Sequence, residues 1–161
     1  MLVTRRVPRR QVRGFTLIEL VTAVTLLAVL AGLAVPAFQG FIANQRIRNT
    51  SFDLMAALML ARSEAVTRNG DVSFSKSGDA WSAGWVVVSG TNTLLSQEAL
   101  RNLSITDTAG LAAIVYGRDG RTSTGSTQFT VAPSATINGV SPRCISVGPS
   151  GVPSSRAGAC S

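Results

Sequence analysis

The hydrophobic pattern sets a long apolar N-terminal segment apart from the rest of the chain. Residues 15–38 are almost continuously apolar, and Glu19 is the only charged residue among them. A helix of this length spans about 36 Å, which exceeds the roughly 30 Å of a bilayer's hydrocarbon core. The pattern therefore predicts a membrane-spanning helix over residues 15–38.

After this segment the apolar residues recur at helical spacing instead of running continuously. The recurring residues are Phe41, Phe52, Met55, Met59 and Val66. Their periodicity predicts an amphipathic helix over residues 39–69, which continues the first helix and ends at the Asn69-Gly70 stop signal. We expect this stripe to pack against the C-terminal part of the chain, with Met55 and Met59 as core residues.

Residues 70–161 contain short β-prone runs separated by Gly, Ser, Thr and Asn. About five strands are expected, over Asp71–Lys76, Gly84–Ser89, Ala112–Tyr116, Thr127–Val131 and Arg143–Val147. Leu94–Leu103 fits either a short helix or a loop. The predicted fold is α+β, with a long helix whose second half packs on a small antiparallel β-sheet head.

The net charge of +7 lies mostly at the N-terminus. Five of the 15 basic residues fall within the first 13 positions, and all eight acidic residues come later. Without residues 1–14, ten basic residues face eight acidic ones, so the remaining charge is only +2. Because basic flanks stay in the cytoplasm, the head is expected on the opposite side of the membrane.

The residue types present argue against enzymatic chemistry and against a bound cofactor. The chain has no histidine and two cysteines, which excludes a Ser-His-Asp triad and a zinc site of the usual spacing. Cys144 and Cys160 lie close together near the C-terminus. They either form a disulfide, which suits an oxidising compartment, or remain free buried thiols.

Three kinds of N-terminal segment have a basic start and an apolar run. A cleaved secretory signal normally has a shorter apolar core, and Val35-Pro36-Ala37 is a poor cleavage site for it. A plain signal anchor does not explain Glu19, because a carboxylate in a spanning helix is costly and is a functional candidate. The third kind is a processed helix in which the acid has a role.

The residues around Glu19 carry a specific resemblance. Arg13-Gly14-Phe15-Thr16-Leu17-Ile18-Glu19-Leu20 resembles the signal of type IV prepilins and type II secretion pseudopilins. The resemblance implies that residues 1–14 are a cytoplasmic leader. A membrane peptidase would cut after Gly14 and methylate the new N-terminus at Phe15. It also implies a single-pass protein of the bacterial inner membrane with a periplasmic head, whose partners are other pilin subunits.

Charge pairing gives Glu19 a physical role in such an assembly. Cleavage would create an ammonium at Phe15, four residues before Glu19. In a filament, Glu19 of one subunit would meet the Phe15 ammonium of another, so that each buried charge gains a partner. The hydroxyls of Thr16, Thr22 and Thr25 are expected to bond to backbone carbonyls of the same helix.

Two further stretches resemble one family of minor pilins and pseudopilins, the GspH/FimT family. They are Leu60–Val66, followed by Arg68 and Gly70, and Trp81–Val88. The resemblance implies a structural component that helps to prime assembly or forms the tip. Secretion pseudopilus and type IV pilus are not distinguished, because both use the same signal and helix.

DNA uptake is the alternative function. Some members of the FimT branch bind DNA through a Gly-Arg-x-Arg sequence between two C-terminal cysteines. Here Gly151 is present, Val152 replaces the first arginine, and Arg156 lies two positions beyond the second. Candidate phosphate contacts are Arg118, Arg121, Arg143 and Arg156.

Overall fold

The computed structural model describes the backbone of residues 14–161, and the side chains of residues 14–32 and 38–161. It divides into two compact units, Met1–Phe38 and Gln39–Ser161, and helix α1 (Leu17–Arg68) contributes to both. The predicted leader, apart from Gly14, lies outside the described residues. The single long helix that the sequence predicts is confirmed.

In the first unit, the apolar side chains of α1 are exposed around the whole helix. Their exposed fractions run from 50% at Val21 to 80% at Leu17. A helix that is apolar on all sides is stable in lipid or among other helices. Within the described residues, no helix combines the length and the apolar character that crossing a membrane requires. The predicted span includes side chains at positions 33–37, which lie outside the description, so it stays a prediction.

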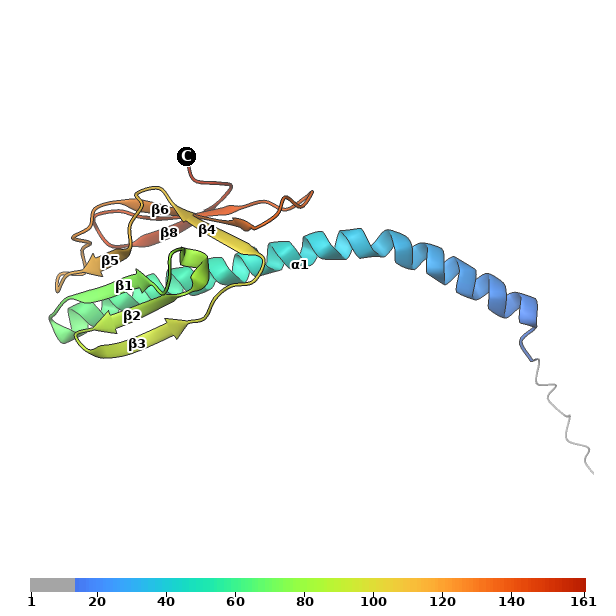
Figure 1. The fold of residues 1–161 in the computed structure, drawn as a ribbon, viewed down its shortest axis with the longest axis horizontal. Helices are drawn as coiled ribbons and strands as arrows, with labels where there is room; N and C mark the ends of the chain where they lie inside the picture. The colour runs from blue at the N-terminus through green and yellow to red at the C-terminus, as the bar shows by residue number, and fades with distance from the viewer. Residues whose placement is uncertain (1–13) are drawn as a thin grey trace, which may run out of the picture. The chain divides into compact units, whose positions relative to one another are not determined.

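The second unit contains eight strands in two antiparallel sheets (Figure 1). The first sheet has the order β3-β2-β1-β5, and the second has the order β4-β6-β7-β8. The strands of the first are β1 (Val72–Lys76), β2 (Trp85–Ser89), β3 (Asn92–Gln97) and β5 (Ala113–Tyr116). The strands of the second are β4 (Leu103–Asp107), β6 (Thr127–Pro133), β7 (Arg143–Val147) and β8 (Pro153–Ala157).

The antiparallel head is therefore confirmed, whereas the expectation of about five strands in one sheet is wrong. The five predicted strands correspond to β1, β2, β5, β6 and β7. Leu94–Leu103, which fitted a helix or a loop, instead contains most of β3 and the first residue of β4. The strand β8 follows a turn at Gly148–Gly151 and pairs with β7 along its full length.

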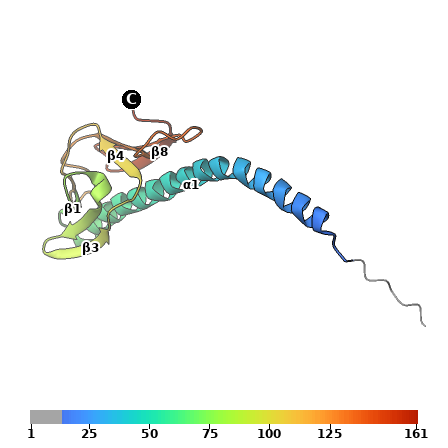
Figure 2. The ribbon, with the colours of Figure 1, turned by 45° about the vertical axis from the view of Figure 1, so that its right-hand side comes forward.

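Both sheets pack along the C-terminal half of α1, as the two views show (Figure 1 and Figure 2). The buried face of the helix carries Ala57, Ala61 and Ala65, whose small side chains let other elements approach closely. Aromatic rings join the two sheets. Trp81, in the short 3-10 helix η1 (Trp81–Ala83), stacks on Phe74 of β1 and meets Phe129 of β6 edge-on, each at 5.0 Å between ring centroids.

The helix buries a different face from the one expected. Its large buried side chains are Ile47, Leu54 and Leu58. Phe52 and Met59 are 66% and 53% exposed, so the prediction that Met59 is a core residue is wrong. Met55 is half-buried against the core, as predicted. The residues of the expected stripe and those of the observed buried face both recur at helical spacing. The observed face carries the small alanine side chains, which allow the sheets to pack closely on the helix.

Candidate functional site

The helix α1 starts directly after the predicted cleavage site. Gly14 and Phe15 are exposed and precede the helix. The Glu19 amide donates to the Thr16 hydroxyl at 3.3 Å, and the Leu20 amide donates to the Thr16 carbonyl at 3.1 Å. Thr16 is therefore the N-cap, which satisfies one of the amides that a helix start leaves unpaired. Gly14 and Phe15, on either side of the predicted cut, are thus exposed in front of a capped helix.

The three threonines near the helix start have two different roles. Thr22 donates to the carbonyls of Ile18 and Glu19, and Thr25 donates to the carbonyl of Val21 at 2.7 Å. These two hydroxyls confirm the expectation. For Thr16 the expected bond to a backbone carbonyl is wrong, because its hydroxyl accepts a hydrogen bond from the Glu19 amide. The spacing Thr16-x-x-Glu19 was the available signal, since it matches a capping box.

Glu19 lies in the first turn of α1 with an exposed side chain. A carboxylate there is stabilised by the positive end of the helix dipole. The only ion pair in the part of the chain that the structure describes joins Glu64 to Arg68, so Glu19 has no ionic partner there. Its predicted partner belongs to another subunit, and the pairing stays a prediction.

The two cysteines form a disulfide, which decides between the two alternatives. Cys144 of β7 is bonded to Cys160, with their Cα atoms 5.0 Å apart. The bond fastens the segment after β8 to the sheet, and the Cys160 amide donates to the Thr130 hydroxyl of β6 at 3.0 Å. Closing a loop of this size contributes roughly 3 kcal/mol in the chain-entropy account.

The structure does not gather the four candidate DNA-contacting arginines into one patch. Arg156 pairs with Cys144 across β7 and β8, whereas Arg143 pairs with Ala157. Because side chains alternate along a strand, Arg143 and Arg156 lie on opposite faces of the sheet. Arg143 donates to Ser155 Oγ at 3.3 Å, and Arg156 donates to Ser161 Oγ at 3.1 Å.

Arg118 and Arg121 lie together in the loop between β5 and β6, beside acidic groups. The Arg121 amide donates to Asp119 Oδ1 at 3.1 Å, and Arg118 shares a surface hollow with Asp71 and Asp119. This loop contacts the turn after β7, at the far end of the β7–β8 pair from Arg143. DNA contact by these four arginines stays a prediction, and their placement gives it little support.

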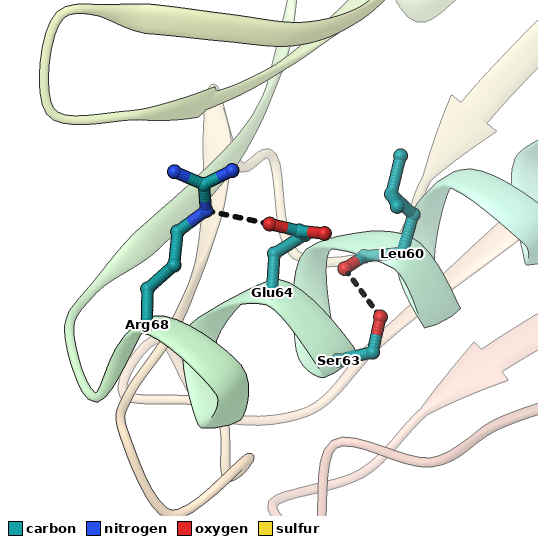
Figure 3. A network of polar contacts seen from close by, with 4 residues as sticks. All are labelled: Leu60, Ser63, Glu64 and Arg68. Carbon is teal, nitrogen blue, oxygen red and sulfur yellow. Dashed lines mark hydrogen bonds and ion pairs between the residues drawn. The ribbon is translucent and has the colours of Figure 1, made fainter.

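Arg62 has a structural role that its sequence context did not indicate. From the sequence, Arg62, Ser63 and Glu64 are interpreted as a solvated face. Ser63 is exposed and donates to the Leu60 carbonyl, and Glu64 pairs with Arg68 along the helix surface (Figure 3). Arg62 instead donates its Nε proton to the Gly120 carbonyl at 3.0 Å, which holds the β5–β6 loop against α1.

The same loop follows Tyr116, whose pKa is raised by burial. Tyr116 is fully buried at the end of β5. Burial raises its pKa to about 12, and the nearby Arg62 charge opposes this effect. The Tyr116 hydroxyl has no hydrogen-bond partner in the described residues.

The described residues contain no group of three or more His, Cys, Asp or Glu side chains that could hold a metal ion.

Two solved structures resemble the fold closely. The type IV minor pilin FimU of Pseudomonas aeruginosa PAO1 is 18% identical, with a TM-score of 0.63, over 75% of this chain and 99% of that one. The minor pseudopilin EpsH of the type 2 secretion system of Vibrio cholerae is 12% identical, with a TM-score of 0.54, over 71% of this chain and 97% of that one. These likenesses show the type IV pilin-like fold.

The sequence matches two family models, and these matches show the family to which the chain belongs, which the fold alone does not show. No curated protein sequence matches the chain significantly. Residues 9–35 match the prokaryotic N-terminal methylation motif, which includes Gly14, Phe15 and Glu19. Residues 52–151, from the last third of α1 to the β7–β8 turn, match the family described as type II transport protein GspH. The chain therefore belongs to the GspH family, whose members are non-enzymatic minor pseudopilins and pilins.

Proposed function

We propose that this minor subunit primes the assembly, or forms the tip, of a type II secretion pseudopilus or a type IV pilus. The observation that carries the proposal is the start of α1. There a capped helix exposes apolar side chains on all sides, with Glu19 as its single acid in the first turn. Such a helix gains stability only where lipid or neighbouring helices cover it.

Processing is the first step of the proposal. The chain is held in the bacterial inner membrane by residues 15–38, and the peptidase cuts there between Gly14 and Phe15 and methylates the Phe15 amine. The exposure of both residues and their position before the helix support this order. Because Thr16 caps the helix, removal of residues 1–14 leaves the first turn of α1 intact.

Assembly then uses the two charges at the new N-terminus. In lipid or in a filament core, the Glu19 carboxylate and the Phe15 ammonium would each be costly alone. Pairing between neighbouring subunits removes both costs at once. It also fixes the axial position of one helix relative to the next, which is what an initiating subunit has to set.

A single substitution tests this role. Glu19→Ala should abolish incorporation into filaments while the protein still accumulates in the membrane. The matched control is Glu98→Ala, which removes an exposed carboxylate from the head. Sheared filaments and membranes are probed separately by immunoblotting. Normal incorporation of Glu19→Ala would contradict the proposed contact.

A further inference from the structure

Four arginines lie around α1 near the point where the second unit begins. Arg46 of α1 shares a surface hollow with Arg101 of the β3–β4 loop. Arg48 of α1 shares another with Arg143, the first residue of β7. Arg46 and Arg48 differ by about 3 Å along the helix axis and by about 200° around it. The two pairs therefore flank α1 on two sides at one level, and we call these four residues the arginine collar.

The collar carries positive charge that no acidic side chain neutralises. Within residues 14–32 and 38–161, the only ion pair joins Glu64 to Arg68. No described Asp or Glu lines either of the two hollows. The acids nearest along the chain, Asp53 and Glu98, are both exposed. Three of the collar arginines are exposed and Arg143 is half-buried, so the collar is open to an anion from outside the chain.

The collar follows the apolar segment closely along the chain. Apart from Glu19, residues 15–45 carry no charge, so Arg46 is the first basic residue after the predicted leader. From Gln39, where the second unit begins, α1 rises about 10 Å to Arg46. Helical side chains tilt toward the N-terminus of their helix, so those of Arg46 and Arg48 extend back toward Gln39. With residues 15–38 in a bilayer, they would reach the lipid headgroups, which occupy roughly 5–8 Å beyond the hydrocarbon core.

We infer that the arginine collar binds the phosphate groups of anionic phospholipids on the head side of the inner membrane. The inference rests on the proposed function, because it requires residues 15–38 to lie in that membrane. A guanidinium group presents parallel N–H donors that match two oxygens of a phosphate. Basic residues next to a membrane span are also attracted by the surface charge of anionic lipids. The contact would hold the head on the membrane before the subunit joins a filament.

The arrangement of the collar favours a flat surface as its ligand. Arginines on two sides of a helix, at one level, can reach the same plane when the helix crosses that plane. A DNA duplex or a single acidic peptide would contact one pair at a time. Phe41 and Ile42, which are 67% and 46% exposed, come directly before the arginines. Apolar side chains followed by cationic ones suit the boundary between hydrocarbon and headgroups.

A fluorescent label on the head tests the contact in the full chain. Cys144 and Cys160 are bonded to each other, so the label reacts only with the new thiol of Thr136→Cys. Thr136 is exposed in the β6–β7 loop, between Ala135 and Ile137, which line a hollow with Arg46. The chain is placed in nanodiscs that contain a phosphatidylcholine with a spin-labelled headgroup as quencher. The other lipid is phosphatidylcholine alone or a mixture with about 30% phosphatidylglycerol.

Quenching should be about twofold stronger in the nanodiscs with phosphatidylglycerol, because the anionic surface draws the collar toward the headgroups. Salt at about 1 M should remove this increase, since the Debye length falls to about 3 Å. Equal quenching in the two lipids, or an increase that persists at high salt, would overturn the inference.

A pair of double variants shows whether the collar causes the increase. Arg46→Gln/Arg48→Gln removes one arginine from each side of α1 and should abolish most of it. The matched control, Arg118→Gln/Arg121→Gln, also removes two exposed arginines and should leave the increase unchanged. The same loss in both double variants would contradict the assignment. Arg101→Gln, which changes a loop instead of the helix, should also weaken the increase, and equal melting temperatures in detergent verify that the folds are intact.

The readout separates the inference from the proposed function, because it involves neither the peptidase nor a second subunit. If Glu19→Ala chains assemble normally, the proposed contact in the filament fails whatever the label shows. If they do not assemble, and lipid charge does not change the quenching, only the collar is wrongly assigned. If lipid charge has no effect and Arg46→Gln/Arg48→Gln lowers incorporation into filaments, the collar binds acidic groups of a neighbouring subunit, which equally overturns the inference.

Discussion

At the scale of single residues, a few polar contacts determine how the chain starts and how its loops are held. Thr16 caps α1 directly after the predicted leader, and Glu19 provides both the capped amide and an exposed carboxylate. Arg62 holds the β5–β6 loop through the Gly120 carbonyl, and Tyr116 is buried at the end of β5, directly before that loop. Substitution of Thr16 or Tyr116 should therefore change the stability of the helix start or of the whole fold, respectively.

The cap predicts a local effect at the helix start. Thr16→Ala should destabilise the first turn of α1 by about 1 kcal/mol, because the Glu19 amide loses its acceptor. Thr16→Ser should retain the bond. Amide hydrogen exchange of Glu19 and Leu20 in detergent micelles measures the difference. Equal protection in the alanine and serine variants would mean that the cap contributes nothing.

The Tyr116 pKa predicts a loss of stability at high pH. Between pH 10 and 12 the unfolded chain releases the phenol proton and the folded chain keeps it, so the free energy of unfolding falls as pH rises. The full decrease is about 2–3 kcal/mol, and below pH 10 this contribution to stability is intact. Urea unfolding from pH 8 to pH 11.5 measures it.

Tyr116→Phe is the matched control for this titration. It should remove the alkaline decrease and leave stability near pH 7 almost unchanged, because the buried hydroxyl has no partner in the described residues. The same alkaline decrease in the phenylalanine variant would assign the titration to another group.

At the scale of elements, the β7–β8 hairpin depends on close backbone contact with the β5–β6 loop. Gly151 has φ 74°, and a Cβ there would lie 3.0 Å from Tyr116 Cε1 and in severe overlap with the Gly120 carbonyl. Only glycine fits this position. The contact places Val152 and Pro153 beside the exposed face of α1.

The close contact at Gly151 predicts a difference in stability between two glycine substitutions. Gly151→Ala should lower the free energy of unfolding by about 1–3 kcal/mol more than Gly125→Ala. Gly125 has a similar φ of 84° with open space around it, so both variants share the backbone strain and only the first adds the overlap. Urea unfolding of the two variants measures the difference. Equal destabilisation would show that the loop moves aside without cost.

The element pattern was partly predictable from the sequence. The sequence predicts the five strands that each contain at least two of Val, Ile, Phe, Tyr and Trp, and it misses β3, β4 and β8. In β3 and β8, Asn, Ser, Thr, Gln and Pro dominate, and these strands form only because a neighbouring strand supplies pairing partners. The N-terminal motif was predictable because its chemistry is local. The buried face of α1 was not, since choosing between two helical stripes requires the shape of the head.

At the scale of the whole molecule, the net positive charge that suggests nucleic-acid binding lies mostly in residues 1–14, the predicted leader. Of the four candidate DNA-contacting arginines, Arg143 and Arg156 lie on opposite faces of the β7–β8 pair, and Arg118 and Arg121 lie in the loop at its far end. Exposed apolar surface, in contrast, is concentrated on α1. The chain as a whole is therefore suited to contacts between helices, which agrees with its membership of a family of pseudopilins and pilins.

This distribution predicts weak or absent DNA binding. In a gel shift at about 150 mM salt, the processed chain (residues 15–161) in detergent should give no salt-sensitive complex at micromolar concentration, because few phosphate contacts can form together. The decisive comparison is with an Arg118/Arg121/Arg143/Arg156 alanine variant. A shift in the unmutated chain that weakens with salt and disappears in the variant would revive the DNA-uptake hypothesis.

The cut between Gly14 and Phe15 is the central prediction, because it would remove the basic leader and create the charge that Glu19 is proposed to meet. Intact-mass and N-terminal peptide mass spectrometry of the protein purified from membranes tests it most directly. We expect a chain that begins at a methylated Phe15. A chain that still begins at Met1, or one cut after Ala37, would contradict the account.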